Sequence, residues 1–212
     1  MNEALAVIIG YFLGSFPSAY LAAKRVLGKD IRKLGGGNVG GLNTFREVGL
    51  GAAIFVFVVD VGKGAAAVAI AYYLLDVEPL WVMLAGLASV VGHNWMVWLK
   101  FTGGKGMGAA IGALAVLFPL YGYGASFFIL LAIILVPLFI TKNIALSMGI
   151  GLFALPVIVW FATKTALPTW LAVVLLLIIA AKFAPTAIAA FKKKGGGALG
   201  KDDWQRDKAK ES

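Results

Sequence analysis

The stretch from Leu50 to Leu75 reads LGAAIFVFVVDVGKGAAAVAIAYYLL and contains two charged residues, Asp60 and Lys63. A helix needs about twenty mostly apolar residues to cross the hydrocarbon core of a bilayer, and this stretch is long enough. Asp60 and Lys63 lie one helical turn apart, and an unpaired charge at this depth would be costly. The stretch therefore predicts a transmembrane helix that carries an internal ion pair.

The whole chain shares this apolar character. Of its 212 residues, 61% are hydrophobic and 14% are charged, and the mean hydropathy is +0.91. A soluble domain is about half apolar and about one quarter charged, so the excess requires lipid as the solvent. The chain has no cysteine and a single histidine, His93, which excludes disulfides, a cysteine nucleophile and a multi-histidine metal site. We therefore expect one compact membrane domain without a metal or another cofactor.

The apolar stretches predict an all-α polytopic membrane protein with seven transmembrane helices. Their expected ranges are 4–23, 50–75, 80–99, 107–122, 123–140, 144–163 and 168–190. Cytoplasmic loops of membrane proteins are enriched in lysine and arginine. With the N-terminus outside, most basic loops face the cytoplasm, and the outer loops hold one cation, Lys164. The expected seven-helix domain covers residues 1–191, and residues 192–212 are expected to form a mobile, basic cytoplasmic tail.

The formal net charge of +9 raises nucleic acid as a partner, but the position of the charges argues against it. Most basic residues lie in the inner loops and near the C-terminus, where they also set the topology. Anionic lipid headgroups and phosphorylated substrates are therefore the expected partners, and no nucleic acid is expected. The sequence leaves the oligomeric state open.

The first inner loop contains a glycine-rich run, Gly35–Gly41, which reads GGGNVGG. Glycine permits backbone conformations that let successive amides converge on an anion. Arg46 follows, and its planar guanidinium suits phosphate. We interpret the segment as an oxyanion site; the alternative is a flexible loop whose cations only set the topology. Its expected phosphate-binding residues are Gly36, Gly37, Asn38, Gly40 and Asn43.

The loop before the fourth span reads KFTGGKGMG over residues 100–108. It resembles a nucleotide-binding phosphate loop, but Gly106 stands where that motif needs a hydroxyl for magnesium, so we reject nucleotide hydrolysis. What is left is Lys105 flanked by Gly103, Gly104 and Gly106, just before a helix whose first amides would point at the same anion. The alternative is an interfacial lysine beside a tight turn.

His93 lies near the inner end of the third predicted span and is followed by Asn94. An imidazole at that depth needs polar partners. Ser89, four residues earlier, lies on the same helical face. Both a structural hydrogen-bonding role and a catalytic role fit this position.

Together these segments resemble the bacterial acyl-phosphate-dependent glycerol-3-phosphate acyltransferases. The matching segments, in order along the chain, are Gly14–Tyr20, Gly37–Gly40 with Asn43 and Arg46, Asp60–Gly64, Gly92–His93 and Phe101–Gly106. The resemblance implies seven spans with the N-terminus outside. It also implies an enzyme of the cell inner membrane that moves a fatty acyl group from acyl phosphate to glycerol-3-phosphate. The product would be lysophosphatidic acid, for phospholipid synthesis, and the site would face the cytoplasm.

The implied reaction asks the site for placement and charge stabilisation, because an acyl phosphate already carries a good leaving group. No covalent nucleophile is required. Arg46, Lys105 and His93 are the expected catalytic residues. The expected partners are acyl phosphate, glycerol-3-phosphate and membrane lipid.

Three positions depart from the family pattern. Glycine replaces a usual serine at Gly36, alanine replaces another at Ala145, and the final motif is not recognisable in Lys182–Thr186. These departures leave open a divergent, non-catalytic paralogue that serves as a lipid-binding or membrane-complex subunit. A transporter for a phosphorylated metabolite is a further alternative. Its polar groups would lie near the bilayer midplane, whereas those of this chain gather at one face.

Overall fold

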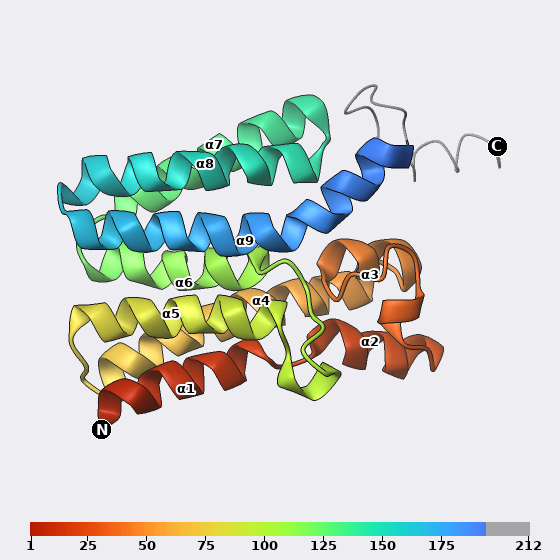
Figure 1. Cartoon of the computed structure of the whole chain (residues 1–212), viewed down its shortest axis with the longest axis horizontal. Helices are drawn as coiled ribbons and strands as arrows, with labels where there is room; N and C mark the ends of the chain where they lie inside the picture. The colour runs from red at the N-terminus through yellow and green to blue at the C-terminus, as the bar shows by residue number, and fades with distance from the viewer. Residues whose placement is uncertain (194–212) are drawn as a thin grey trace. The chain divides into compact units, whose positions relative to one another are not determined.

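The computed structural model describes residues 1–193, which form helices joined by loops, with no strand in that range (Figure 1). The chain falls into two compact units, which meet in the sequence between Phe127 and Phe128. The tail expected from residue 192 lies, from residue 194 onward, outside the described residues. The expected all-α class is confirmed for the described part of the chain.

The first unit is built from α1 to α6. Their bounds are α1 (Asn2–Gly14), α2 (Ser18–Leu27), α3 (Gly41–Glu47), α4 (Leu50–Ala69), α5 (Pro79–Asn94) and α6 (Met107–Leu120). Short helical turns cover Ile31–Lys33, Ile70–Leu74 and Val97–Leu99. The first predicted span, 4–23, is broken between α1 and α2, because Pro17 has no amide hydrogen with which to continue the helix.

Five described segments are long and apolar enough to cross a membrane. They are Asn2–Leu27, Leu50–Leu74, Gly124–Thr141, Leu146–Thr163 and Ala166–Pro185. The two other predicted spans are helical but shorter, as α5 and α6. The predicted range 80–99 was too long, because the Gly104 amide donates to the carbonyl of His93 at 3.0 Å and α5 ends at Asn94. Seven crossings therefore stay a prediction.

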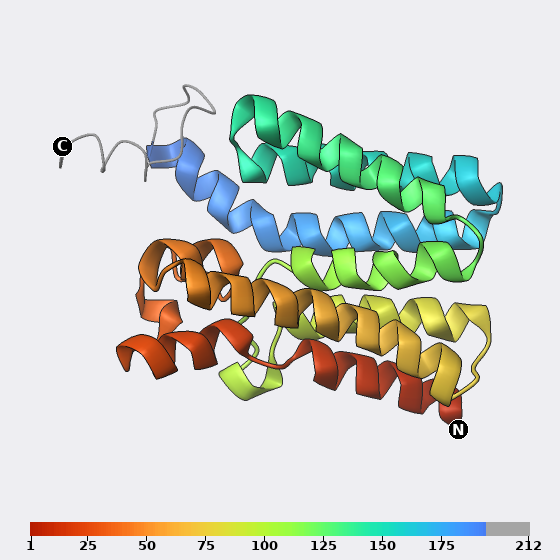
Figure 2. The same cartoon turned by 180° about the vertical axis from the view of Figure 1, so that it is seen from behind.

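Glycines let the helices of the first unit approach closely. A Cβ atom on Gly10 of α1 would overlap the Ala85 carbonyl of α5, and one on Gly112 of α6 would overlap the Val61 carbonyl of α4. Seen from behind, α6 in light green lies directly beside α4 in orange and yellow (Figure 2). Helices in lipid gain little from burying apolar surface, so close packing at small residues must hold them together.

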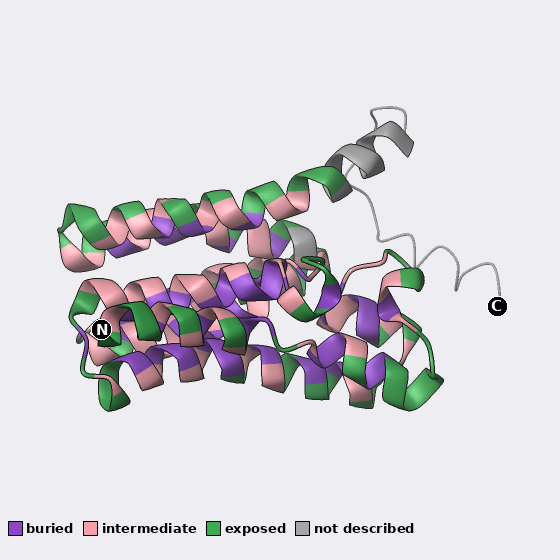
Figure 3. Cartoon of the chain, turned by 60° about the horizontal axis from the view of Figure 1, so that its bottom comes forward, coloured by how far each residue is buried: buried purple, intermediate pink, exposed green. Residues whose placement is uncertain are grey.

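The second unit contains most of α7 (Gly124–Thr141), together with α8 (Ile144–Thr163) and α9 (Ala166–Lys193). Its buried core residues are Leu130, Ile134, Leu155, Val159, Ala172, Leu175 and Ile179. Large side chains such as Phe139, Phe153 and Trp170 are exposed. Figure 3 shows exposed positions along the outer sides of the helices in each unit. Apolar outer faces of this kind are typical of helices that contact lipid.

Replacing Gly112 with valine should separate α4 from α6, because the new Cβ would meet backbone that has no room to move. We expect a destabilisation of about 1–3 kcal/mol or more, measured as a lower thermal unfolding midpoint of the purified protein in detergent. Gly62→Val is the matched control, since nothing lies within 4 Å of a Cβ at that position. Equal midpoints for the two variants would contradict close packing at Gly112.

Candidate functional site

Two loops of the first unit carry most of the predicted site residues. The first loop comprises residues 28–40, and the second loop comprises residues 95–106. Part of the expected glycine loop is helical, because Gly41–Glu47 forms α3. This short helix carries both Asn43 and Arg46, so Arg46 extends from a fixed helical turn instead of a flexible segment.

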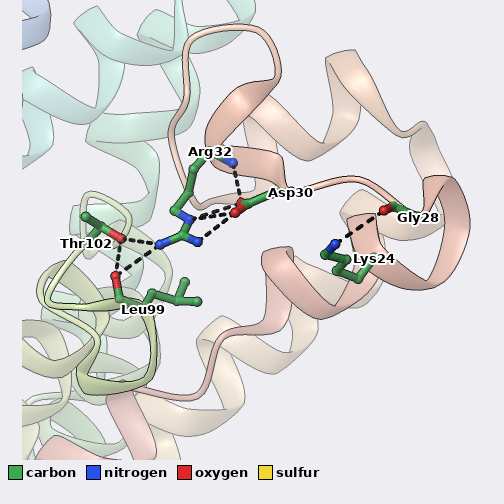
Figure 4. Close-up of polar contacts among 6 residues, drawn as sticks. All are labelled: Lys24, Gly28, Asp30, Arg32, Leu99 and Thr102. Carbon is green, nitrogen blue, oxygen red and sulfur yellow. Dashed lines mark hydrogen bonds and ion pairs between the residues drawn. The ribbon is translucent and has the colours of Figure 1, made fainter.

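Arg32 joins the two loops (Figure 4). Its Nη1 donates to the Leu99 carbonyl at 3.2 Å and to the Thr102 hydroxyl at 3.3 Å, both in the second loop. Its Nε donates to both carboxylate oxygens of Asp30, and its Nη2 donates to Oδ2 of Asp30 at 2.6 Å. The Arg32 guanidinium lowers the pKa of Asp30, and the Asp30 carboxylate in turn raises the pKa of Arg32. Arg32 therefore acts as a charged clamp between the two loops, a role that the sequence around it does not indicate.

Gly104 brings the two loops into direct contact. Its amide donates to the His93 carbonyl at 3.0 Å. A Cβ atom on Gly104 would overlap the Nε2 side of the His93 ring and would lie 2.6 Å from the carbonyl oxygen of Val39 in the first loop. Only glycine fits here, so the residue before Lys105 is held between the imidazole and the first glycine loop.

His93 also belongs to a buried polar cluster around Asp60. The Asp60 carboxylate accepts from the Ser18 hydroxyl and pairs with the Lys63 ammonium, each at 2.8 Å, and His93 Nδ1 lies 3.6 Å from the same oxygen. Lys63 also donates to the Phe16 carbonyl at 3.3 Å. All four cluster side chains are buried. The predicted ion pair of Asp60 and Lys63 is confirmed, and its charges lie against the histidine of the site.

Ser89, which the helical spacing placed on the face of His93, donates its hydroxyl to the carbonyl of Gly86 at 2.7 Å within α5. It therefore serves its own helix. The polar neighbour of His93 came instead from α4, a contact that only the tertiary structure reveals.

Arg46 and Lys105 come within electrostatic range of each other. Burial lowers the pKa of the Lys105 ammonium, and the positive charge of Arg46 lowers it further. Both side chains are partly buried. Two cations that repel each other in a partly buried place are stabilised when an anion lies between them. This arrangement is what a phosphate site requires.

Asn43 holds the first loop in shape. Its Oδ1 accepts from the Gly36 amide at 3.2 Å, and its Nδ2 donates to the Leu34 carbonyl at 3.1 Å. Gly35 and Gly37 have φ angles of +51° and +69°, a conformation that favours glycine. Gly36 itself is exposed, with nothing within 4 Å of a Cβ position.

The remaining glycines pack against side chains or carbonyls. A Cβ on Gly40 would lie 3.0 Å from Asn38 Nδ2, and one on Gly103 would lie 2.7 Å from the Asn94 carbonyl oxygen. Gly106 has φ +78° and directly precedes the first residue of α6, so the amides of that helix open toward the loop. Within the described residues, no three His, Asp or Glu side chains could together hold a metal ion.

The segment after α7 belongs to the second unit. There the Ser147 hydroxyl is buried and donates to the Asn143 carbonyl at 2.9 Å, while Asn143 Oδ1 caps α8 by accepting from the Leu146 amide at 3.0 Å. Both polar side chains thus complete the start of a helix.

Residues 4–192 match the family model described as glycerol-3-phosphate acyltransferase. This chain belongs to the glycerol-3-phosphate acyltransferase family. Glycerol-3-phosphate acyltransferase 1 of Dehalococcoides mccartyi is 53% identical to it over 84% of this chain and 86% of the relative. A glycerol-3-phosphate acyltransferase of Shouchella clausii is 42% identical over 70% of this chain and 69% of its own length.

A solved structure has the same fold. It is the crystal structure of PlsY, an integral membrane glycerol 3-phosphate acyltransferase, in its glycerol 3-phosphate form. The TM-score is 0.81 and the sequence identity 25%, over 93% of this chain and 95% of the PlsY chain. The lysophosphatidic acid form of PlsY is similar at a TM-score of 0.78. The family that the sequence motifs indicated is therefore confirmed. The prediction of an integral membrane protein is confirmed as well.

The Arg32 clamp can be tested by hydrogen exchange. Arg32→Gln removes the donors to Leu99 and Thr102, so the backbone amides of residues 99–104 should exchange faster in the purified protein. Lys33→Gln is the matched control, because Lys33 is the exposed neighbouring cation and carries the same charge. If both variants exchange like the parent, or both change equally, Arg32 does not hold the second loop.

Proposed function

We propose that this acyltransferase moves a fatty acyl group from acyl phosphate to glycerol-3-phosphate and so makes lysophosphatidic acid for phospholipid synthesis. The observation that carries the proposal is the pair of cations, Arg46 and Lys105, beside two glycine loops that meet at Gly104. Family membership supports it. So does the likeness to PlsY in its glycerol 3-phosphate form.

In this proposal Arg46 and Lys105 hold the phosphate of glycerol-3-phosphate, close to the phosphate that leaves the acyl donor. The glycerol hydroxyl oxygen attacks the acyl carbonyl carbon, the bond from that carbon to the phosphate oxygen breaks, and phosphate leaves with the bonding electron pair. The hydroxyl proton passes to the departing phosphate, so no protein nucleophile is consumed. Fixed cations and amides stabilise the charge that develops on the phosphate, and holding both substrates lowers the entropic barrier.

The other site residues support this charge. We assign direct phosphate contacts to the backbone amides of Asn38, Gly40, Gly103 and Gly106. The amides of Gly36, Gly37 and Gly104 donate to Asn43, Leu34 and His93, so these glycines hold the two loops in shape around the phosphate. Asn43 shapes the first loop through its bonds to Gly36 and Leu34. His93 positions Gly104 through its ring and its carbonyl, with Asp60 beside Nδ1.

We also propose the topology that the basic loops favour: seven spans, the N-terminus outside, and the site on the cytoplasmic side of the cell inner membrane. Five segments that could cross a membrane support it, and α5 and α6 would supply the other two crossings. Membrane lipid is then a partner along the outer helix faces. The basic tail, residues 192–212, is part of the same proposal as a cytoplasmic segment.

The second candidate function is a non-catalytic lipid-binding subunit. It is favoured by Gly36, which offers no side chain where the family pattern has a serine hydroxyl. An assay of the purified protein with acyl phosphate and labelled glycerol-3-phosphate separates the two. Lysophosphatidic acid formation supports the transferase. Binding of the substrates without formation of lysophosphatidic acid would support the non-catalytic subunit.

Arg46 and Lys105 should act on one phosphate. Each charge-assisted hydrogen bond contributes about 1.5–3 kcal/mol, so Arg46→Ala or Lys105→Ala should weaken glycerol-3-phosphate binding by about ten- to a hundredfold in calorimetric titration. The double variant should lose less than the sum, because both cations contact one anion. Arg46→Lys should also bind more weakly, since lysine lacks the planar fork.

Lys33→Ala is the control for these titrations, because it removes an exposed cation of the same loop region. Its affinity should equal that of the parent protein. Unchanged affinity in both Arg46→Ala and Lys105→Ala would end the phosphate-site hypothesis and remove the main physical support for the transferase.

His93 should matter less to substrate binding than the two cations. One imidazole cannot match the charge of a phosphate, so His93→Gln should keep measurable glycerol-3-phosphate binding while it lowers the turnover of acyl transfer. Lys105→Gln should lose affinity in the same titration. Should His93→Gln abolish binding while Lys105→Gln binds normally, the two roles are reversed.

A further inference from the structure

The second loop begins with a compact turn that points two aromatic rings outward. We call residues 95–102 the aromatic finger. Met96 and Thr102 pair across it, and the Phe101 amide donates to the Met96 carbonyl at 2.9 Å. Met96 and Leu99 are buried, whereas Trp98 and Phe101 are 61% and 60% exposed. One side of the finger thus belongs to the core of the first unit, and the other side is unusually apolar for a water-facing loop.

The tip of the finger is strained. Lys100 and Phe101 have φ angles of +55° and +58°, in a region that side chains other than glycine seldom adopt. Such strain persists only where the surroundings over-determine it, and it concentrates at functional sites. Here the Arg32 guanidinium holds the Leu99 carbonyl, and the Tyr11 hydroxyl donates to the Trp95 carbonyl at 2.8 Å. The fold therefore fixes the exposed aromatic tip; it is not a loose loop.

The finger lies beside a membrane-crossing segment. The Trp98 ring packs on Phe12 of α1 with the ring centroids 6.1 Å apart, and α1 belongs to the candidate span Asn2–Leu27. Figure 1 shows the finger, in yellow-green, next to the break between α1 and α2. Phe12 lies in the last turn of α1, which ends at Gly14 just before the break at Pro17. Tryptophan is enriched at the ends of membrane helices, between hydrocarbon and headgroups. The contact with Phe12 therefore places the finger at the level of the end of α1.

The charges around the finger suit anionic lipid. Lys100 is exposed at the tip, and no acidic residue occurs in residues 95–106. The buried side of the finger packs with Ala19, Ala22 and Ala23 of α2. The C-terminal end of α2 exposes Arg25, Val26 and Leu27. An exposed surface that alternates cations with large apolar side chains matches the layer of phosphates above acyl chains.

We propose that the aromatic finger is an interfacial anchor that binds the anionic phospholipid surface of the membrane on the side that carries Lys105. Trp98 and Phe101 lie at the level where headgroups meet acyl chains, and the Lys100 ammonium contacts a lipid phosphate. The finger ends at Thr102, immediately before Gly103, so the anchor also sets the depth of the phosphate loop. This proposal does not depend on acyl transfer, because a lipid-binding subunit would need the same contact.

Nitroxide labelling tests the depth directly, and the absence of native cysteine allows single labels. The full-length variants Trp98→Cys and Phe101→Cys would be labelled in vesicles of phosphatidylcholine with phosphatidylglycerol. Collision with oxygen and with a water-soluble nickel chelate then reports depth. Phe57→Cys, exposed in a candidate span, gives the lipid reference, and Glu47→Cys, exposed on α3, gives the water reference. We expect positions 98 and 101 to favour oxygen over nickel by at least threefold relative to position 47.

The contact of Lys100 with anionic lipid is tested in the same labelled proteins. Adding Lys100→Gln should remove the increase in depth that phosphatidylglycerol gives over phosphatidylcholine alone. Lys164→Gln is the matched control, because Lys164 is also exposed and has a similar φ of +52°. Nickel accessibility at positions 98 and 101 equal to that at position 47 would overturn the anchor. A depth that is the same in both lipids would overturn its preference for anionic lipid.

Discussion

One buried carboxylate ties together the part of the fold that carries the site. Asp60 lies in α4, which belongs to a segment long and apolar enough to cross a membrane. Its charge is met by Lys63 of the same helix, by the hydroxyl of Ser18 on α2 and by the imidazole of His93 on α5. Burying such a charge in lipid without partners would cost roughly several kcal/mol. The need for partners therefore holds three helices together at Asp60. The end of α5, and with it the start of the second loop, is fixed by this requirement.

From that point the site is built outward by contacts that need either glycine or arginine. Gly104 rests on the ring of His93 and reaches the first loop, which only a residue without a Cβ can do. Arg32 then binds the second loop through Nη1, and the Asp30 carboxylate neutralises the charge of its guanidinium. Lys105 follows the fixed Gly104 contact and Arg46 lies on the short helix α3, and the positive charge of Arg46 lowers the pKa of Lys105. The buried charges around Asp60 thus position the end of α5, and Gly104 and Arg32 position the second loop.

The sequence predicted the features that depend on local pattern. The helical stretches follow from apolar length, and the pair of Asp60 and Lys63 follows from their spacing and the cost of charge in lipid. The family also followed from the sequence, because its motifs occur in order. Arg46 and Lys105 could be proposed as partners only by assuming that their spans are neighbours. The structure shows that α4 and α5, the second and third predicted spans, do contact each other.

The features that the sequence did not predict depend on residues far apart in the chain or on the end of a helix. The bond from Arg32 to Leu99 joins residues 67 positions apart, and nothing in either segment alone indicates it. α3 has only seven residues, too few to show a helical period, and it is stabilised by what it touches. α5 is shorter than its apolar stretch because the Gly104 amide satisfies one of its last carbonyls.

The pairing of Asp60 with Lys63 inside a single helix bears on how the chain enters the membrane. A helix that carried one of these charges alone would have to wait for a neighbour before it could leave the aqueous environment of the insertion machinery. With both charges one turn apart and 2.8 Å from each other, α4 is close to electrically neutral by itself. It can therefore partition into lipid as an independent unit. Ser18 of α2 and His93 of α5 add the polar contacts that α4 does not supply by itself.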